Sequence, residues 1–254
     1  MTKSLLVAMT LALLPPSLFA VDGVVLINQS TVMAAGGFPY VISQPGSYKL
    51  SGSLTMITTP AGNYAPLAAD VAIVITHSGV VLDLNGFSIA VTNTNNTLSH
   101  PWVAITDDGS CSPTDILHCS YEQIVIRNGV ISLRSNTDNG SPMGFAAGIN
   151  LSGSASNLLE DLAVSMRGGT LGNTVLHVTA DAMRIGPESV IRHNVLYGFL
   201  RPTCPSVVTE NATLDFSSGF PAGPTGACTT FANVRKGPDA ETFAASLMHF
   251  KRAS

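Results

Sequence analysis

Short apolar runs with a two-residue period recur along the chain, and residues 71–91 show the pattern most clearly. Within this stretch Ile73 and Ile75 alternate with smaller side chains, and Leu82 and Leu84 alternate in the same way after a Ser-Gly corner. A third run follows an Asn-Gly corner. Side chains that alternate in this way point to opposite faces of a strand. The stretch therefore predicts three short β-strands, each with one buried face.

The same two-part phrase returns further along the chain. Its first part, which ends at Ile75, is echoed by phrases that end at Ile105, Leu151 and Ile185, at steps of 30, 46 and 34 residues. Its second part is echoed at Ile124–Gly129, Leu159–Asp161 and Ile191–Asn194. Rows that cannot bury their apolar side chains alone bury them by stacking, so the repeat predicts a solenoid. A β-sandwich of unrelated hairpins is the alternative, and the matched two-part spacing counts against it.

The first 20 residues have the composition of a signal peptide. Lys3 supplies a weakly positive start, the apolar core runs from Leu5 to Leu14, and we expect cleavage near Ala20. The apolar run is too short to span a bilayer, so we predict no membrane span. The mature protein is therefore expected to be soluble and exported, either periplasmic or extracellular.

Four cysteines remain after the expected cleavage: Cys111, Cys119, Cys204 and Cys228. An even number of cysteines in an exported chain favours disulfides, for which three pairings are possible. We favour the local pairs 111–119 and 204–228, each of which closes a loop that contains proline. Zinc is the competing interpretation, but the chain has no Cys-x-x-Cys spacing, so we predict no metal ion at these residues.

The chain ends in a segment with helical periodicity. Phe243, Leu247 and Phe250 share one helix face, and Pro238 suits the first turn. Such a helix would cover the end of a solenoid. The predicted organisation is a signal peptide (1–20), a β-helix domain with an N-terminal strand cap (21–237) and a C-terminal helix or cap (238–254).

Composition narrows the possible partners. Charged residues make up 11% of the chain, well below the roughly 25% of ordinary soluble domains. The net charge is -4 and no basic run is present. Phosphate binding requires clustered Lys and Arg, so we expect no nucleic-acid partner.

The Asn-Gly corners at residues 85–86 and 128–129, with the flanking phrases Val80–Leu84 and Gln123–Arg127, resemble right-handed parallel β-helix proteins of the pectin-lyase-like superfamily. The resemblance covers most of the mature chain and implies one all-β, right-handed parallel β-helix of about five or six coils. It also implies a ladder of stacked asparagines at one corner, which Asn194 would continue. It does not imply one activity, because the fold hosts lyases, hydrolases, epimerases, adhesins and phage tail proteins.

In lyases of this superfamily, clustered aspartates bind calcium and an arginine or lysine acts as the base. From their positions in the rows and in the inserted loop, the candidates for these roles are Asp83, Asp107, Asp161, Arg127 and Arg192, although no motif of the family is present around either arginine. Stacked on one outer face, they would form a groove for an acidic sugar, with calcium bridging its carboxylate. A ladder of solvated surface charges is the alternative interpretation, and we favour it.

Two aromatic residues are candidates for stacking on a sugar ring. Trp102 is the only tryptophan of the chain, and Tyr197 lies in an alternating run. Each is also a candidate for core or corner packing. Packing is the more frequent role of an aromatic residue at the start of a row.

Three functions remain open on the sequence. The first is a non-catalytic exported protein that binds polysaccharide or a cell-surface glycan, favoured because no complete catalytic motif is present. The second is a polysaccharide lyase that acts on acidic polysaccharide by calcium-assisted β-elimination. The third is a structural or adhesive module, which would require a protein partner. Calcium is expected only for the lyase, and no other cofactor is predicted.

Overall fold

The structure is a computed structural model, and it describes residues 23–58, 62–67, 69–93, 101–111, 119–135, 146–168, 180–185, 187–197, 199–202, 206–213, 229–231 and 234–235. The predicted signal peptide, the predicted bond between Cys204 and Cys228 and the predicted C-terminal helix lie outside the described residues. Within the described residues, no helix is long and apolar enough to cross a membrane.

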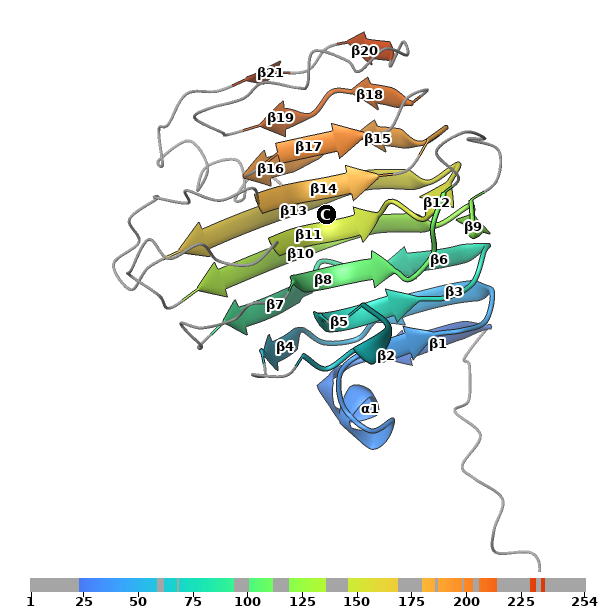
Figure 1. Ribbon diagram of the computed structural model, residues 1–254, viewed down its shortest axis with the longest axis vertical. Coiled ribbons are helices and arrows are strands. Elements are labelled where there is room, and N and C mark those ends of the chain that lie inside the picture. Colours follow the sequence, from blue (N-terminus) through green and yellow to red (C-terminus); the bar gives the residue numbers. More distant parts are fainter. Residues whose placement is uncertain are drawn as a thin grey trace, which may run out of the picture.

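Nearly all the described elements are strands, and the strands pair in parallel (Figure 1). The larger sheet has two wings. The first wing has the order β1 (Val24–Ile27), β3 (Gly46–Leu50), β6 (Val80–Asp83), the start of β10 (Val125–Ser135), the start of β13 (Leu158–Gly168), β15 (Val190–Arg192), β18 (Val207–Thr209) and β20 (Thr229–Phe231). The second wing contains β4 (Leu54–Ile57), β7 (Ser88–Asn93), the ends of β10 and β13, β16 (Val195–Tyr197), β19 (Ala212–Thr213) and β21 (Val234–Arg235).

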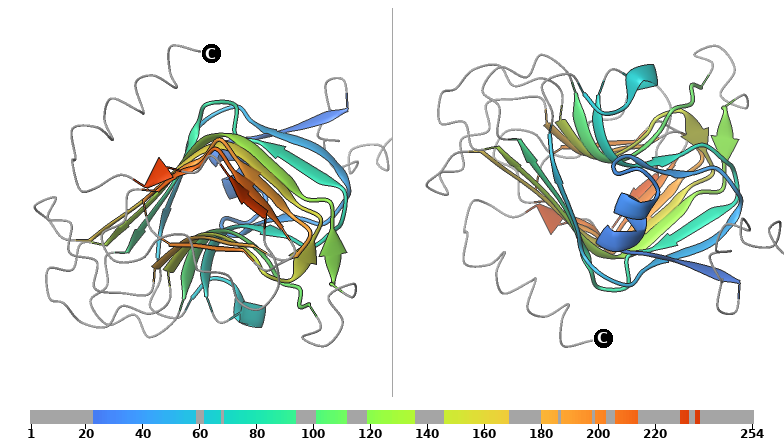
Figure 2. Two further views of the ribbon diagram at one scale, coloured as in Figure 1. Left: turned by 90° about the horizontal axis from the view of Figure 1, so that it is seen from above. Right: turned by 90° about the horizontal axis from the view of Figure 1, so that it is seen from below.

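A second sheet faces the bend between the two wings, as the views along the stack in Figure 2 show. Its order is β2 (Tyr40–Ile42), β5 (Asp70–Ile75), β8 (Trp102–Asp107), β11 (Ala146–Leu151), β14 (Ala180–Ile185) and β17 (Phe199–Pro202). The chain passes from β5 to β6 and β7 before it returns to this sheet at β8, so one coil supplies a strand to each face. The predicted parallel, mainly β stack is confirmed.

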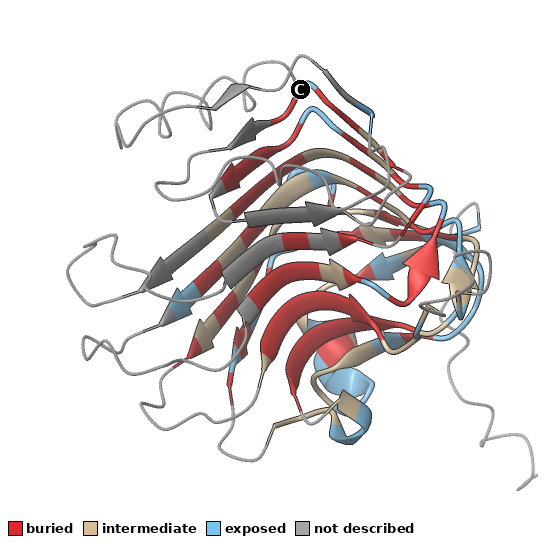
Figure 3. Cartoon of the chain, turned by 45° about the horizontal axis from the view of Figure 1, so that its top comes forward, coloured by how far each residue is buried: buried red, intermediate tan, exposed pale blue. Residues whose placement is uncertain are grey.

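The core runs along the inside of the stack. Leu82, Ile126, Leu159 and Ile191 lie in register on successive strands, and none of them is exposed. Figure 3 shows the buried positions running up the stack from coil to coil. Alternation along each strand thus gives a continuous apolar column, as the repeat predicts.

The pairing register differs from the expected one in the first coils. Ile105 lies opposite Ile73 rather than Ile75, whereas Leu151 lies opposite Ile185 as expected. A shift of two residues keeps every side chain on its own face, so alternation alone does not reveal it. These apolar side chains were therefore predicted on the correct face even where the rungs were not.

The bend between the wings is a column of left-handed residues. Asn128, Asp161, His193 and Glu210 all have positive φ, between 53 and 58°. Asparagine, aspartate and histidine adopt this conformation more readily than most residues, which accounts for the Asn-Gly phrase, Asp161 and His193 but not for Glu210. Asn85 also has positive φ, but its corner is two residues longer, because Asp83 and Ser88 pair with Arg127 and Val130.

A buried amide ladder lies one position after this column, and the predicted position of Asn194 is corrected by it. Asn194 is in register with Leu162 and Asn211, not with the corner asparagines. Its Oδ1 accepts the Leu162 N–H at 3.0 Å, and its Nδ2 donates to the Leu159 carbonyl at 3.1 Å. The Asn194 N–H donates in turn to Asn211 Oδ1 at 3.0 Å. The ladder is formed by Asn194 and Asn211, and the exposed Asn85 and Asn128 stand outside it.

A short helix covers the N-terminal end of the core where a strand cap was predicted. α1 (Gln29–Ala34) lies across the stack in the view from below (Figure 2), and its Val32 is fully buried. Asn28 is the N-cap, and the side chains of Asn28 and Thr31 each accept the other's backbone N–H. This reciprocal capping box is the local signal that identifies the helix in the sequence.

Candidate functional site

The outer face of the first wing carries a row of charges that alternate in sign. The row consists of Lys49, Asp83, Arg127, Glu160 and Arg192, which lie in register on β3, β6, β10, β13 and β15. Neighbouring strands are about 4.8 Å apart, so like charges recur about every 9.6 Å along the stack. Three of the predicted candidates thus share one face, and Lys49 and Glu160 complete the row.

A row of aliphatic side chains runs beside the charges, two residues earlier on each strand. It consists of Val81, Val125, Leu158, Val190 and Val207, all outward-facing and half-buried. We call the charged row and the aliphatic row together the track. The sequence contained the signal for the track, since each outward position repeats from coil to coil. The track was missed because the expected pairing register was shifted from the observed one.

The two arginines of the track are held differently. Arg192 Nε and Nη2 donate to Glu160 Oε2 at 2.9 and 2.7 Å. The hydrogen bond to this carboxylate raises the pKa of the Arg192 guanidinium above its usual value. Arg127 Nε stands 3.5 Å from Asp83 Oδ2, and that buried nitrogen has no hydrogen-bond partner in the described part of the chain. Arg192 is therefore engaged by a carboxylate, and Arg127 is only loosely paired.

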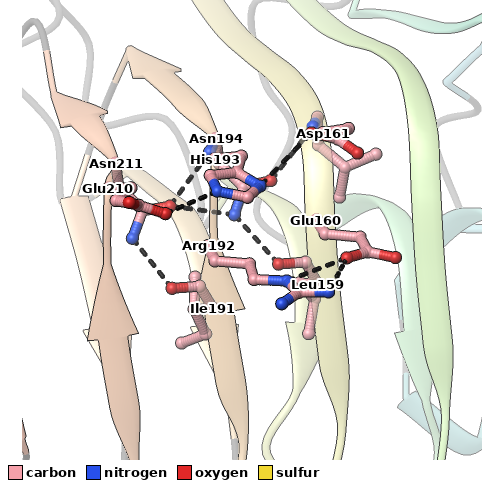
Figure 4. A network of polar contacts seen from close by, with 10 residues as sticks. Leu159, Glu160, Asp161, Ile191, Arg192, His193, Asn194, Glu210 and Asn211 are labelled. Carbon is pink, nitrogen blue, oxygen red and sulfur yellow. Dashed lines mark hydrogen bonds and ion pairs between the residues drawn. The ribbon is translucent and has the colours of Figure 1, made fainter.

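A second ionic group lies at the bend, at one edge of the track (Figure 4). His193 stands between two carboxylates from neighbouring coils: its Nε2 lies 2.5 Å from Glu210 Oε2 and its Nδ1 lies 3.7 Å from Asp161 Oδ1. Asp161 therefore belongs to the corner column and not to the row of Asp83, from which it is displaced by one residue. All three side chains are substantially exposed.

The remaining carboxylate candidate, Asp107, lies in the other sheet and is buried. It ends β8 with 3% of its surface exposed, and both of its oxygens accept the Gly153 N–H at 3.2 Å. Burial raises the pKa of Asp107 to about 7, although hydrogen bonds from Ser154, Gly153 and Gly109 act in the opposite direction. The structure does not bring Asp107 into the row with Asp83 and the arginines.

The neighbouring carboxylate, Asp108, is held by two phenols that sequence reasoning did not connect to it. Tyr64 and Tyr121 each donate a hydrogen bond to one Asp108 oxygen, both at 2.7 Å. Burial, with the hydrogen bond to Asp108, raises the pKa of each phenol to about 12. The three residues come from three separate segments, so nothing in their sequence spacing predicts the contact.

The other candidate residues are placed as follows. Cys111 and Cys119 form the predicted disulfide. Trp102 is 2% exposed and packs in the core, which excludes it as a surface stacker and favours the packing interpretation. The Tyr197 backbone lies in β16, in register with Ser165. No group of three or more His, Cys, Asp or Glu residues is placed to hold a metal ion within the described residues.

The chain matches no protein-family model, no curated protein and no solved structure.

Proposed function

We propose that this chain is a non-catalytic exported protein that binds an extended polysaccharide along the track. The observation that carries the proposal is the repetition of the track: each coil from β6 to β15 presents one aliphatic and one charged side chain at the same place. A polymer that runs along the stack would meet one aliphatic and one charged side chain at a constant interval of about 4.8 Å, with the sign of the charge alternating from one coil to the next.

The two rows match the two kinds of surface on a sugar ring. The aliphatic row offers branched side chains to the C–H face of a ring, where apolar area leaves water. The charged row offers guanidinium donors and carboxylate acceptors to ring hydroxyls, and hydrogen bonds with a charged partner are the stronger ones. Charged side chains that are already paired on the protein need less ordering on binding.

The proposal includes the handedness of the stack, the number of its coils, the export of the protein and its superfamily. We infer that the stack has about five or six coils. We infer that it winds to the right, because parallel crossover connections are almost always right-handed. Export is supported by the bond between Cys111 and Cys119, since disulfides persist in oxidising compartments. From the residues at the corners we also infer that the chain belongs to the pectin-lyase-like superfamily.

Binding is tested by pull-down on insoluble polysaccharides and by affinity electrophoresis, with variants of one strand. On β10, Val125 belongs to the track, and Val130 is an outward valine of the second wing that is also half-buried. Val125→Ser is expected to weaken binding about tenfold through lost apolar contact, and Val130→Ser is expected to leave it unchanged. Equal effects of the two substitutions, or no binding to any polymer tested, would contradict the proposal.

The charged row has its own matched pair. Arg127→Gln is expected to weaken binding, whereas Arg134→Gln, on the second-wing part of β10, is the control. A calcium-dependent rise in ultraviolet absorbance on polygalacturonate or alginate would instead favour the lyase. Loss of polysaccharide binding together with retention of a protein partner would favour the adhesive module.

A further inference from the structure

The signs of the charged row alternate without interruption over five neighbouring strands. The row runs from Lys49 on β3 to Arg192 on β15, with a carboxylate between each pair of cations. A row of this kind is complementary to its own reverse. When it is laid antiparallel against a second copy, with an offset such that no strand faces its own copy, every charge that meets a charge meets the opposite sign.

A two-fold axis that lies along the strands produces this arrangement. It keeps the strand direction and reverses the direction of the stack, so the charged row faces the partner's charged row and the aliphatic row faces the partner's aliphatic row. With the axis between β6 and β10, Asp83 would face the partner's Arg127, and Lys49 would face the partner's Glu160. Each contact occurs twice, because such an interface uses the same surface of both copies.

The same axis brings apolar side chains together beside the charges. The facing pairs of the aliphatic row would be Val81 with Val125, Ser47 with Leu158, and Val24 with Val190. Leu26 continues the charged row on β1 and is 46% exposed, one of four large apolar side chains that are exposed in the described residues. It would lie against the methylene groups of the partner's Arg192. The pairing would therefore remove apolar surface from water along the whole track.

Two members of the charged row have capacity for a partner outside their own chain. The Arg127 side chain is 41% exposed, and its Nε has no hydrogen-bond partner in the described part of the chain. Arg192 takes only Oε2 of Glu160. An unrelated protein would match the alternation only by its own independent pattern, whereas a second copy matches it by symmetry.

We propose that two copies of this chain pair through the track, antiparallel and about this two-fold axis. The track is about 24 Å long and three residues wide, smaller than the standard contact of about 800 Å² on each partner. The dimer is therefore weak and in exchange with the monomer, with a Kd in the micromolar range. Its charges set the offset between the copies, and its aliphatic row supplies the apolar contact.

Pairing covers the surface that we propose for polysaccharide, so the two partners exclude each other. A polysaccharide that binds only the monomer lowers the fraction of dimer, and dimerisation lowers the affinity for the polysaccharide to the same extent. This consequence rests on the proposed function, but the dimer itself does not.

The test is sedimentation equilibrium of the mature chain over a range of protein concentrations, with two charge reversals. Asp83→Arg places a cation opposite the partner's Arg127, and Arg127→Asp places a carboxylate opposite the partner's Asp83. Each variant alone is expected to associate at least about tenfold more weakly than the wild type, because both symmetric contacts become repulsive. Arg134→Asp, on the second-wing part of β10, lies outside the track and is expected to associate as the wild type does.

An equimolar mixture of the two reversed variants is expected to restore association, because both contacts of the mixed dimer then join a cation to a carboxylate. Restoration also shows that the two variants are folded. The proposal is overturned by a chain that stays monomeric well above micromolar concentrations, by a dimer that neither reversal weakens, or by a mixture that associates no better than its components.

Soluble fragments of a polysaccharide retained in the pull-down are expected to shift the wild-type protein to monomer. Fragments that bind the intact dimer would place the contact between the copies elsewhere and overturn the proposal. The two proposals fail separately: a dimer that binds no polysaccharide contradicts the proposed function alone, and a polysaccharide-binding chain that never pairs contradicts the dimer alone.

Discussion

Asp83 and Arg127 face each other on adjacent coils without forming a hydrogen bond through Arg127 Nε. That nitrogen lies 3.5 Å from Asp83 Oδ2, while Asp83 Oδ1 accepts the Asn85 N–H at 2.8 Å and the Asn128 amide at 3.3 Å. The carboxylate is thus satisfied by the corner residues. The guanidinium is held next to it chiefly by the register of the strands.

Removal of the Arg127 charge is therefore expected to leave the fold intact. Arg127→Gln should change the free energy of unfolding by less than about 0.5 kcal/mol, because exposed ion pairs contribute little. A double-mutant cycle with Asp83→Asn, measured by urea unfolding, is expected to give a coupling energy near zero. A coupling well above about 1 kcal/mol would assign the charged row a structural role and weaken the case for a binding surface.

The amide ladder is expected to behave in the opposite way. Asn194 is 1% exposed and serves the Leu162 N–H, the Leu159 carbonyl and Asn211 at the same time. Asn194→Ala would leave these buried groups without partners and should destabilise the protein by about 2–4 kcal/mol. The control is Asn128→Gly at the exposed corner, where positive φ suits glycine and the change should be within about 0.5 kcal/mol.

Alternation and repeat length were sufficient to predict the stacked strands and the inward columns, because both depend on which face a side chain occupies. The parallel direction of the strands was implied only by the resemblance to β-helix proteins. The local disulfide between Cys111 and Cys119 was predictable because its loop is short. The exact pairing of residues between neighbouring coils was not predictable. Ile73 pairs with Ile105 where Ile75 was expected, and this shift of two residues changes the neighbours of a side chain without changing its face.

The corner was less predictable than the strands, because its residues differ chemically. Asp161 was expected in the row of Asp83, but Glu160 takes that place and Asp161 joins the left-handed column. The contacts of Asp108 with Tyr64 and Tyr121 were not predictable from spacing, since they join three separate segments. Register decided which charges met, and two-residue periodicity does not fix the register at a left-handed corner, where the alternation is interrupted.

The two Asn-Gly corners are expected to differ in their tolerance of a side chain. A Cβ added to Gly129 would lie 2.2 Å from the Leu84 Cβ atom, whereas one added to Gly86 meets nothing within 4 Å. Gly129→Ala should therefore destabilise the protein by about 2–3 kcal/mol through overpacking. Gly86→Ala, at φ +77°, should cost only about 1 kcal/mol of backbone strain. Urea unfolding of the two variants distinguishes them, and equal losses would refute the close approach of Leu84.

The raised pKa of Asp107 gives stability a defined dependence on pH. The pKa is about 7 in the folded protein, against about 3.9 for an exposed aspartate. Because the folded-state pKa is the higher one, the contribution of Asp107 to stability is fully present below about pH 4 and is lost as the pH rises through about 7.

Over that window the free energy of unfolding of the wild-type protein is expected to fall, relative to Asp107→Asn, by about 2–4 kcal/mol. The difference between the two proteins, measured by urea unfolding at each pH, removes the contribution of the other carboxylates, which titrate in both. Asp108→Asn serves as the control that keeps Asp107 and should retain most of the dependence, because burial, and not the neighbouring charge, is the largest cause of the raised pKa. A wild-type protein whose stability relative to Asp107→Asn rises between pH 4 and 7 would show that the donors at Gly153, Ser154 and Gly109 outweigh burial, and that Asp107 is held as a charged carboxylate.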